Sequence, residues 1–249
     1  MPDFKHKTIH DLVAEDYVRA SVLYHFGVKF YDYQTSTLAE VCEAHGLNVK
    51  TVLNGLESAP TKQAGKLQLA AYPIDLVLEY LTHTHYLFVK KRLPYLAQMI
   101  DGLEKVDFRY KILAADLKEI FPLFVEDFIH HIYEEEDTLF SYIKQLTRFL
   151  SDDVPGTHLF YLMQKCSVQE FALGHEVHEN EMEGLRKITN GYKYCEEADL
   201  HIKVLFDELA RFEQDLLTHA RIEDDILFPK ALQLEKQVKF RFYETSKLN

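Results

Sequence analysis

The sequence predicts an all-α protein, with an up-down-up-down four-helix bundle preceded by a small helical N-terminal domain. The 249 residues include only 9 Gly and 7 Pro, and long segments with helical hydrophobic periodicity lie between them. Four of these segments are long and are joined by short connections, as in helix bundles. One ten-residue pattern, with a His and a Glu on the same helical face, also occurs twice.

Residues 1–58 are predicted to form the small helical domain. Helical patterns occupy four stretches, Thr8–Leu12, Tyr17–Phe26, Thr37–His45 and Val49–Leu56. Gly27 and Gly46 are the expected stop signals of two of them, because glycine readily adopts the left-handed conformation that ends a helix. A polar stretch that contains proline and glycine then predicts a linker over residues 59–72.

Residues 73–249 are predicted to form the bundle. Its long helical patterns are Pro73–Asp101, Lys111–Leu150, Pro155–Thr189 and Glu196–Leu234. Pro155 is a suitable first helical residue after the cap that Asp153 provides. Pro94 and Pro122 lie inside two patterns, where proline removes a backbone hydrogen bond, so a bend or a division is expected there.

Composition excludes several classes of function. The net charge of −12 argues against a nucleic-acid partner, which requires a basic patch. No apolar run reaches the roughly 20 residues of a membrane span, and the N-terminus lacks an apolar signal core. Three scattered cysteines do not make a disulfide framework. A cytoplasmic protein that does not enter a membrane is therefore expected.

The repeated pattern predicts a metal centre. Its copies contain His131 with Glu135 and His219 with Glu223, and both read H-x-x-x-E-[DE]-D-x-L-F. A His and a Glu four residues apart share a helical face and offer a nitrogen and an oxygen ligand to one point. Each pair lies on the apolar stripe of its helix, where a Glu is costly unless it is paired or bound to a cation.

The other two long helices supply further histidines. In the first, His85 continues the apolar line, whereas His83 lies roughly 200° around the helix and is the fallback. In the third, His175 and His178 both continue the apolar line, so one is the expected ligand and the other an additional or supporting one. His201 faces the same way as His219 but lies about 27 Å earlier along the axis, which predicts a core histidine instead.

The doubled motif resembles hemerythrin-like HHE cation-binding proteins, and more closely the repair-of-iron-centres (RIC) family of di-iron proteins. The segment His219–Pro229 resembles the family's C-terminal motif, and His178-Glu-Asn-Glu its third-helix histidine motif. The stretch Arg92-Leu-Pro-Tyr resembles the one that follows the first-helix histidine. The resemblance implies four histidines and two bridging glutamates as ligands, which match His85, His131, Glu135, His178, His219 and Glu223.

The chain departs from the family pattern at two places. Alignment on Leu93-Pro94 places the family's first-helix histidine at Tyr86, one residue after His85. The Cys-Cys-Gly-Gly turn of the family's N-terminal domain matches Tyr31-Asp32-Tyr33-Gln34 here, so thiol chemistry is absent from that turn.

The ligand set suits two iron ions, with manganese or zinc as substitutes, and the ions are expected to be bridged by Glu135, Glu223 and an oxo or hydroxo group.

The resemblance implies a stress-response protein that binds or reduces nitric oxide or oxygen species, or supplies iron to damaged iron–sulfur clusters. Nitric oxide, O2 or peroxide, and iron–sulfur proteins, are then the expected partners. A sensor or carrier that binds O2 or NO reversibly without turnover, and a structural zinc bundle, are the alternatives. The sequence leaves open whether the protein is an enzyme, and whether its N-terminal domain packs on the bundle or pairs two chains into a homodimer.

Overall fold

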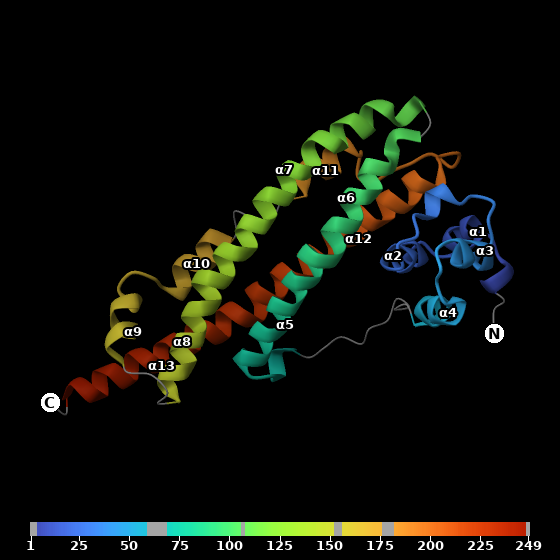
Figure 1. The fold of residues 1–249 in the computed structure, drawn as a ribbon. Coiled ribbons are helices and arrows are strands. Elements are labelled where there is room, and N and C mark those ends of the chain that lie inside the picture. The colour runs from blue at the N-terminus through green and yellow to red at the C-terminus, as the bar shows by residue number, and fades with distance from the viewer. Residues whose placement is uncertain (1–3, 59–68, 106–107, 152–155, 176–181, 248–249) are drawn as a thin grey trace. The chain divides into compact units, whose positions relative to one another are not determined.

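The computed structural model describes residues 4–58, 69–105, 108–151, 156–175 and 182–247. The regular elements of this part of the chain are helical (Figure 1), which confirms the predicted all-α class. Two compact units are present. The first comprises Met1–Lys66, Leu93–Phe121 and Leu185–Arg211, and the second Leu67–Arg92, Pro122–Gly184 and Phe212–Asn249. Most of the predicted linker 59–72 falls outside the described residues, and the predicted domain limits stay a prediction.

The first unit contains four short helices close to the predicted positions. They are α1 (Ile9–Glu15), α2 (Val18–His25), α3 (Leu38–Ala44) and α4 (Val49–Glu57). Side-chain caps explain where they begin. Thr37 and Glu40 form a reciprocal capping box at α3, and the side chain of Asn48 accepts a hydrogen bond from the Lys50 N–H at α4.

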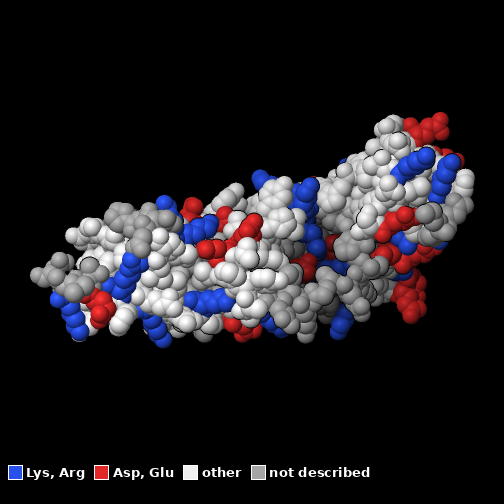
Figure 2. Space-filling model, turned by 90° about the horizontal axis from the view of Figure 1, so that it is seen from below, with Lys and Arg blue, Asp and Glu red and all other residues white. Residues whose placement is uncertain are grey.

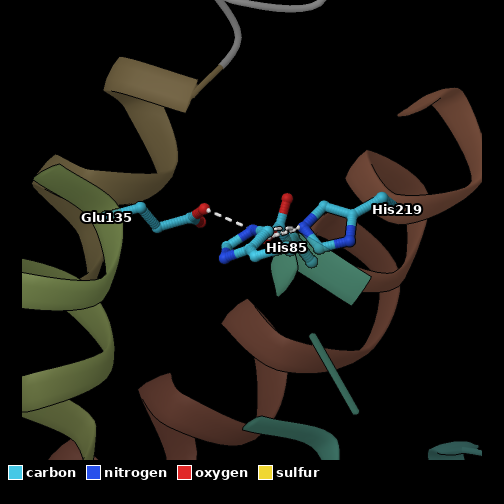
Figure 3. A group of neighbouring side chains, drawn as sticks. His85, Glu135 and His219 are labelled. Atoms are coloured by element: carbon cyan, nitrogen blue, oxygen red, sulfur yellow. Dashed lines mark hydrogen bonds and ion pairs between the residues drawn. The ribbon is translucent and has the colours of Figure 1, made fainter. Parts of the chain in front are cut away.

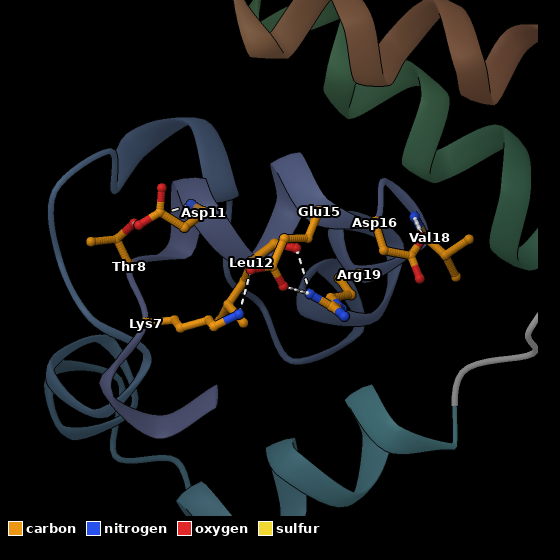
Figure 4. A network of polar contacts seen from close by, with 8 residues as sticks. All are labelled: Lys7, Thr8, Asp11, Leu12, Glu15, Asp16, Val18 and Arg19. Atoms are coloured by element: carbon orange, nitrogen blue, oxygen red, sulfur yellow. Dashed lines mark hydrogen bonds and ion pairs between the residues drawn. The ribbon is translucent and has the colours of Figure 1, made fainter. Parts of the chain in front are cut away.

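A polar network connects α1 to α2 (Figure 4). Arg19 on α2 donates hydrogen bonds to the Glu15 carboxylate, at 2.8 Å, and to the Leu12 carbonyl, at 3.0 Å. Lys7 donates to the same Glu15 carboxylate from the start of α1. Exposed ion pairs of this kind contribute roughly 0–1 kcal/mol each. Burial of Ile9, Leu12 and other apolar side chains is therefore the larger stabilising effect in this unit.

The predicted core histidine is confirmed. His201 lies in α12 (Leu200–Ile222), and its Nε2–H donates to the Met99 carbonyl of α6 (Leu93–Asp101) at 2.8 Å. Its ring stacks on Tyr31 with the ring centroids 4.2 Å apart, and burial lowers its pKa to about 4. Tyr31, where the RIC family has a cysteine, thus takes part in packing within the first unit.

The second unit has one hydrophobic core to which helices from four stretches of the chain contribute. These helices are α5 (Ile74–Leu87), α8 (Ser141–Leu150), α9 (Gly156–Met163), α10 (Val168–His175) and α13 (Phe228–Lys247), and α8 and α10 both contact α13. The four stretches correspond to the four long predicted helices, and the up-down-up-down order stays a prediction.

The third long pattern does not form one helix in the described residues. Residues 156–189 contain α9, α10 and α11 (Glu183–Ile188) as separate helices. Between α9 and α10, Ser167 accepts a hydrogen bond from the Glu170 N–H, and the Glu170 carboxylate accepts one from the Ser167 N–H. This capping box starts a new helix at that point, so the prediction of a continuous helix was wrong there.

Three π-helical turns interrupt the long helices of the second unit. They are η4 (Phe88–Arg92), η7 (Glu136–Phe140) and η8 (Glu223–Leu227). The first helix divides at η4, directly before α6 with its Pro94, as expected. By contrast, α7 (Lys111–Glu135) continues through Pro122 and ends at η7, so the helix is not divided at Pro122, and a bend there stays a prediction.

No helix in the described part of the chain is long and apolar enough to span a membrane. Figure 2 shows Lys and Arg side chains interspersed with Asp and Glu on the face that it draws. That face therefore offers no continuous basic surface of the kind that binds a phosphate backbone.

Candidate metal centre

Four buried side chains with metal-ligating atoms converge in the second unit. They are His85 from α5, Glu135 from the end of α7, His219 from α12 and Glu223 from the start of η8. Each is at most 7% exposed, and one ligand atom of each lies within 4.8 Å of the others. Two histidines and two carboxylates in an apolar interior are a costly arrangement in the absence of a cation.

The distances between these atoms fit ligands of a metal ion. The Nε2 atoms of His85 and His219 are 2.8 Å apart. Nε2 of His85 lies 3.4 Å from the Glu135 carboxylate, and Nε2 of His219 lies 3.0 Å from that of Glu223. Figure 3 shows His85 between Glu135 and His219, and the contacts of both residues meet at Nε2 of His85. Two ligands at right angles on an ion with bonds of ~2.1 Å lie about 3 Å apart, so these separations are those of atoms that can share an ion.

Glu136 orients the His85 ring. Its carboxylate accepts a hydrogen bond at 2.8 Å from Nδ1–H of His85, which leaves the Nε2 lone pair directed toward the four-residue group. Burial lowers the pKa of His85, and the neighbouring His219 lowers it further, although Glu136 opposes both effects. The neutral imidazole, which is the form that binds metals, is therefore favoured.

The π turns coincide with the candidate ligands. η7 begins directly after Glu135, η8 begins at Glu223, and η4 begins three residues after His85. The π-helical segment thus lies within the tail of the repeated motif, E-[DE]-D-x-L-F, in both copies, although it begins one position earlier in the second copy. Single π turns inside α-helices are frequent at functional sites.

A cavity of about 60 Å³ borders the group. Its lining includes the four converging residues, His131, Glu213, and apolar side chains such as Phe88, Phe128 and Leu216. A cavity of this volume can hold a few water molecules or a diatomic molecule. His131, which the repeat predicts as a ligand, is half-buried and lines this cavity.

The remaining predicted ligands differ in position. His178 lies outside the described residues, and His175 is the last residue of α10, with a side chain that is not described. His83 is exposed and its ring lies 6.3 Å from that of Tyr86, which is itself 53% exposed. The structure therefore brings His85 into the group and leaves His83 and Tyr86 outside it.

Sequence reasoning did not identify Glu136 or Glu213. In a regular α-helix Glu136 is displaced by about 100° from Glu135, so helical periodicity alone does not direct it to the same face. The sequence feature that could have identified it is its position in the repeat, directly after the candidate ligand Glu135. Glu213 lies outside the repeat, and its only signal was a carboxylate beside the buried Phe212.

Replacement of His85 with alanine should reduce bound iron or shift the optical spectrum, because a converging nitrogen is lost. His83→Ala should leave both unchanged, since the His83 side chain is exposed. Metal analysis and optical spectroscopy of the two purified variants check this. The opposite pattern would show that His83, and not His85, is the ligand of this helix.

Glu136→Leu should weaken metal binding about 10–100-fold, the usual effect of losing a residue that orients a ligating histidine. Glu136→Gln keeps an acceptor oxygen for His85 and should retain most of the affinity. Asp137→Leu, in the same π turn but exposed, is the matched control. A competition titration against a chelator measures all three, and equal affinities for Glu136→Leu and the control would exclude the orienting role.

No protein-family model matches the chain. The chain is 21% identical over 199 residues to the iron-sulfur cluster repair protein YtfE of Yersinia pseudotuberculosis, over 80% of this chain and 84% of that protein. YtfE of Yersinia pestis is similar to the same extent. The chain thus has distant similarity to iron–sulfur cluster repair proteins over most of its length, which confirms the resemblance seen in the motifs.

Proposed function

We propose that this protein is a non-haem di-iron protein of the nitrosative and oxidative stress response. The observation that carries the proposal is the buried group of His85, Glu135, His219 and Glu223, whose ligand atoms converge from three helical segments. The similarity to proteins named for iron–sulfur cluster repair supports the same conclusion independently.

The donor set explains the choice of metal. Neutral imidazole nitrogens and carboxylate oxygens together suit iron, and also manganese or zinc. Four converging residues support this proposal, and His131, in the lining of the same cavity, with His178 as the third-segment histidine, would complete a set for two ions. His85, Glu135, His219 and Glu223 would hold the iron, and when bound it would supply redox-active positions for small ligands.

The chain's own residues would select the ligand. The cavity of about 60 Å³ has room for a molecule of the size of nitric oxide or O2 next to the converging residues. Phe88, Phe128 and Leu216 form the apolar part of its wall, against which a neutral diatomic molecule can pack. Glu136 would hold His85 in the ligating tautomer throughout.

The relatives' names suggest the physiological role. They are described as iron–sulfur cluster repair proteins, and we propose that this chain likewise supplies iron to damaged clusters or removes the nitric oxide and oxygen species that damage them. Its partners would then be iron–sulfur proteins and a small diatomic ligand, in the cytoplasm.

Metal analysis combined with Mössbauer and optical spectroscopy tests the proposal. Protein loaded anaerobically with ferrous iron should bind about two ions per chain and show a charge-transfer band on oxidation. Rapid mixing with nitric oxide under electron supply should then consume it. Binding without consumption would indicate a reversible sensor or carrier, and tight zinc without a charge-transfer band would indicate a structural site and reject the proposal.

A further inference from the structure

One carboxylate in the cavity has no role in the centre described above. Glu213 lies on α12, six residues before His219, which corresponds to about 9 Å along the helix axis. It lines the same cavity as the four converging residues, together with the apolar Leu216 and Leu217. It is 9% exposed, so the fold holds a third carboxylate inside this region.

Glu213 is not one of the converging ligands. The group whose ligand atoms lie within 4.8 Å of one another contains His85, Glu135, His219 and Glu223 and does not include it. Like His131, Glu213 lines the cavity but stands outside this group, so a resident and a transient role for it are separated by the measurements below. An ion or a small molecule inside the cavity, however, comes next to the Glu213 side chain, because that side chain forms part of the wall.

We infer that Glu213 is a transit ligand, which binds ferrous iron transiently as the ion enters or leaves the centre. The inference rests on the proposed iron-binding function and names the residue through which iron exchanges. A divalent ion loses much of its hydration in a buried cavity with apolar walls, and this desolvation raises the barrier to its movement. A carboxylate on the route offsets part of that cost, since it supplies an anionic oxygen where water is excluded.

A transit ligand changes the rates of iron uptake and release and leaves the equilibrium affinity for iron unchanged. If Glu213 stabilises the ferrous ion only while it moves between solvent and the centre, removal of Glu213 slows iron uptake and iron release by the same factor. The number of ions bound at saturation then stays the same. A resident ligand behaves differently, because its loss lowers occupancy or affinity. The two roles are therefore separable by measurements of iron binding that do not depend on any enzymatic activity.

The experiment uses the full-length protein loaded with ferrous iron under anaerobic conditions. A ferrous chelator in excess reports the rate of release, and stopped-flow mixing of the metal-free protein with ferrous iron reports uptake. Glu213→Gln should slow both on the order of tenfold, which corresponds to ~1.4 kcal/mol on each barrier, with unchanged stoichiometry. Glu208→Gln is the matched control, because Glu208 is 3% exposed on the same helix but does not line the cavity.

Each outcome is decisive. Equal rates in Glu213→Gln and wild type would overturn the inference, and so would a loss of bound iron in Glu213→Gln or equal slowing in Glu208→Gln. If Glu213→Gln does not fold, Glu213→Asp, which withdraws the carboxylate by one methylene, should also slow both rates, and wild-type rates there would overturn it. Failure of the wild-type protein to bind iron would instead reject the proposed function itself.

Discussion

Glu135→Ala should lower the iron content of the loaded protein from about two ions per chain to about one. Glu135 is 6% exposed and lies 3.4 Å from Nε2 of His85, and in the proposed centre it is shared between the two ions. Its loss removes one anionic oxygen from each ion, so the ion with fewer remaining protein ligands dissociates. Metal analysis of the purified, loaded protein measures the change directly.

The same helix supplies the control for this experiment. His130 and Glu134 have the same spacing as His131 and Glu135, but their side chains are 80% and 67% exposed and their closest N and O atoms are 3.8 Å apart. Glu134→Ala should therefore leave the iron content normal. Normal iron in Glu135→Ala would show that the inward-facing pair does not bind the metal.

Removal of metal should lower the melting temperature of the protein. Glu135 and Glu223 are 6% and 1% exposed, and without a cation their carboxylates stay buried close to each other at a cost in folding free energy. Metal at about 1,000 times its Kd adds about 4 kcal/mol, which corresponds to roughly 10 °C for a chain of this size. Calorimetry of chelated and ferrous-loaded protein under anaerobic conditions measures the difference.

A double variant identifies the source of this effect. Glu135→Gln with Glu223→Gln removes both buried charges while keeping the side-chain volumes, so its metal-free form should melt higher than metal-free wild type. Its own difference between chelated and iron-treated samples should shrink. If loaded and metal-free wild-type protein melt at the same temperature, the buried group does not bind metal and the di-iron proposal should be abandoned.

Hydrophobic periodicity in the sequence is sufficient to identify much of the buried group. His85, Glu135, His219 and Glu223 each continue an apolar line on a long helical pattern, and each is buried in the structure. Such a prediction succeeds because the direction of a side chain around a helix depends only on its place in the chain. The repetition of a His–Glu pair distinguishes this site from a surface ion pair such as that of His130 with Glu134.

Regular α-helical spacing does not predict the direction of side chains where the backbone departs from α-helical geometry. Three π turns lie beside the candidate ligands, and each shifts the positions that follow it relative to a regular helix. Glu136, at the first position of η7, contacts His85 although a regular helix would direct it about 100° away from Glu135. In the predicted helix Pro155–Thr189 the hydrophobic pattern is continuous, but the capping box at Ser167 starts a new helix there.

The sequence by itself determined the helical class, the inward direction of His85, Glu135, His219 and Glu223, and the repeated His–Glu pair, because all three follow from local backbone geometry. Only the tertiary structure decided which of these residues meet. His85 and His219 are 134 positions apart in the chain, and their 2.8 Å approach depends on how α5 and α12 pack. The contact of Glu136 with His85 and the presence of Glu213 in the cavity wall also depend on packing between distant segments. Such packing cannot be predicted from the hydrophobic periodicity of either segment alone.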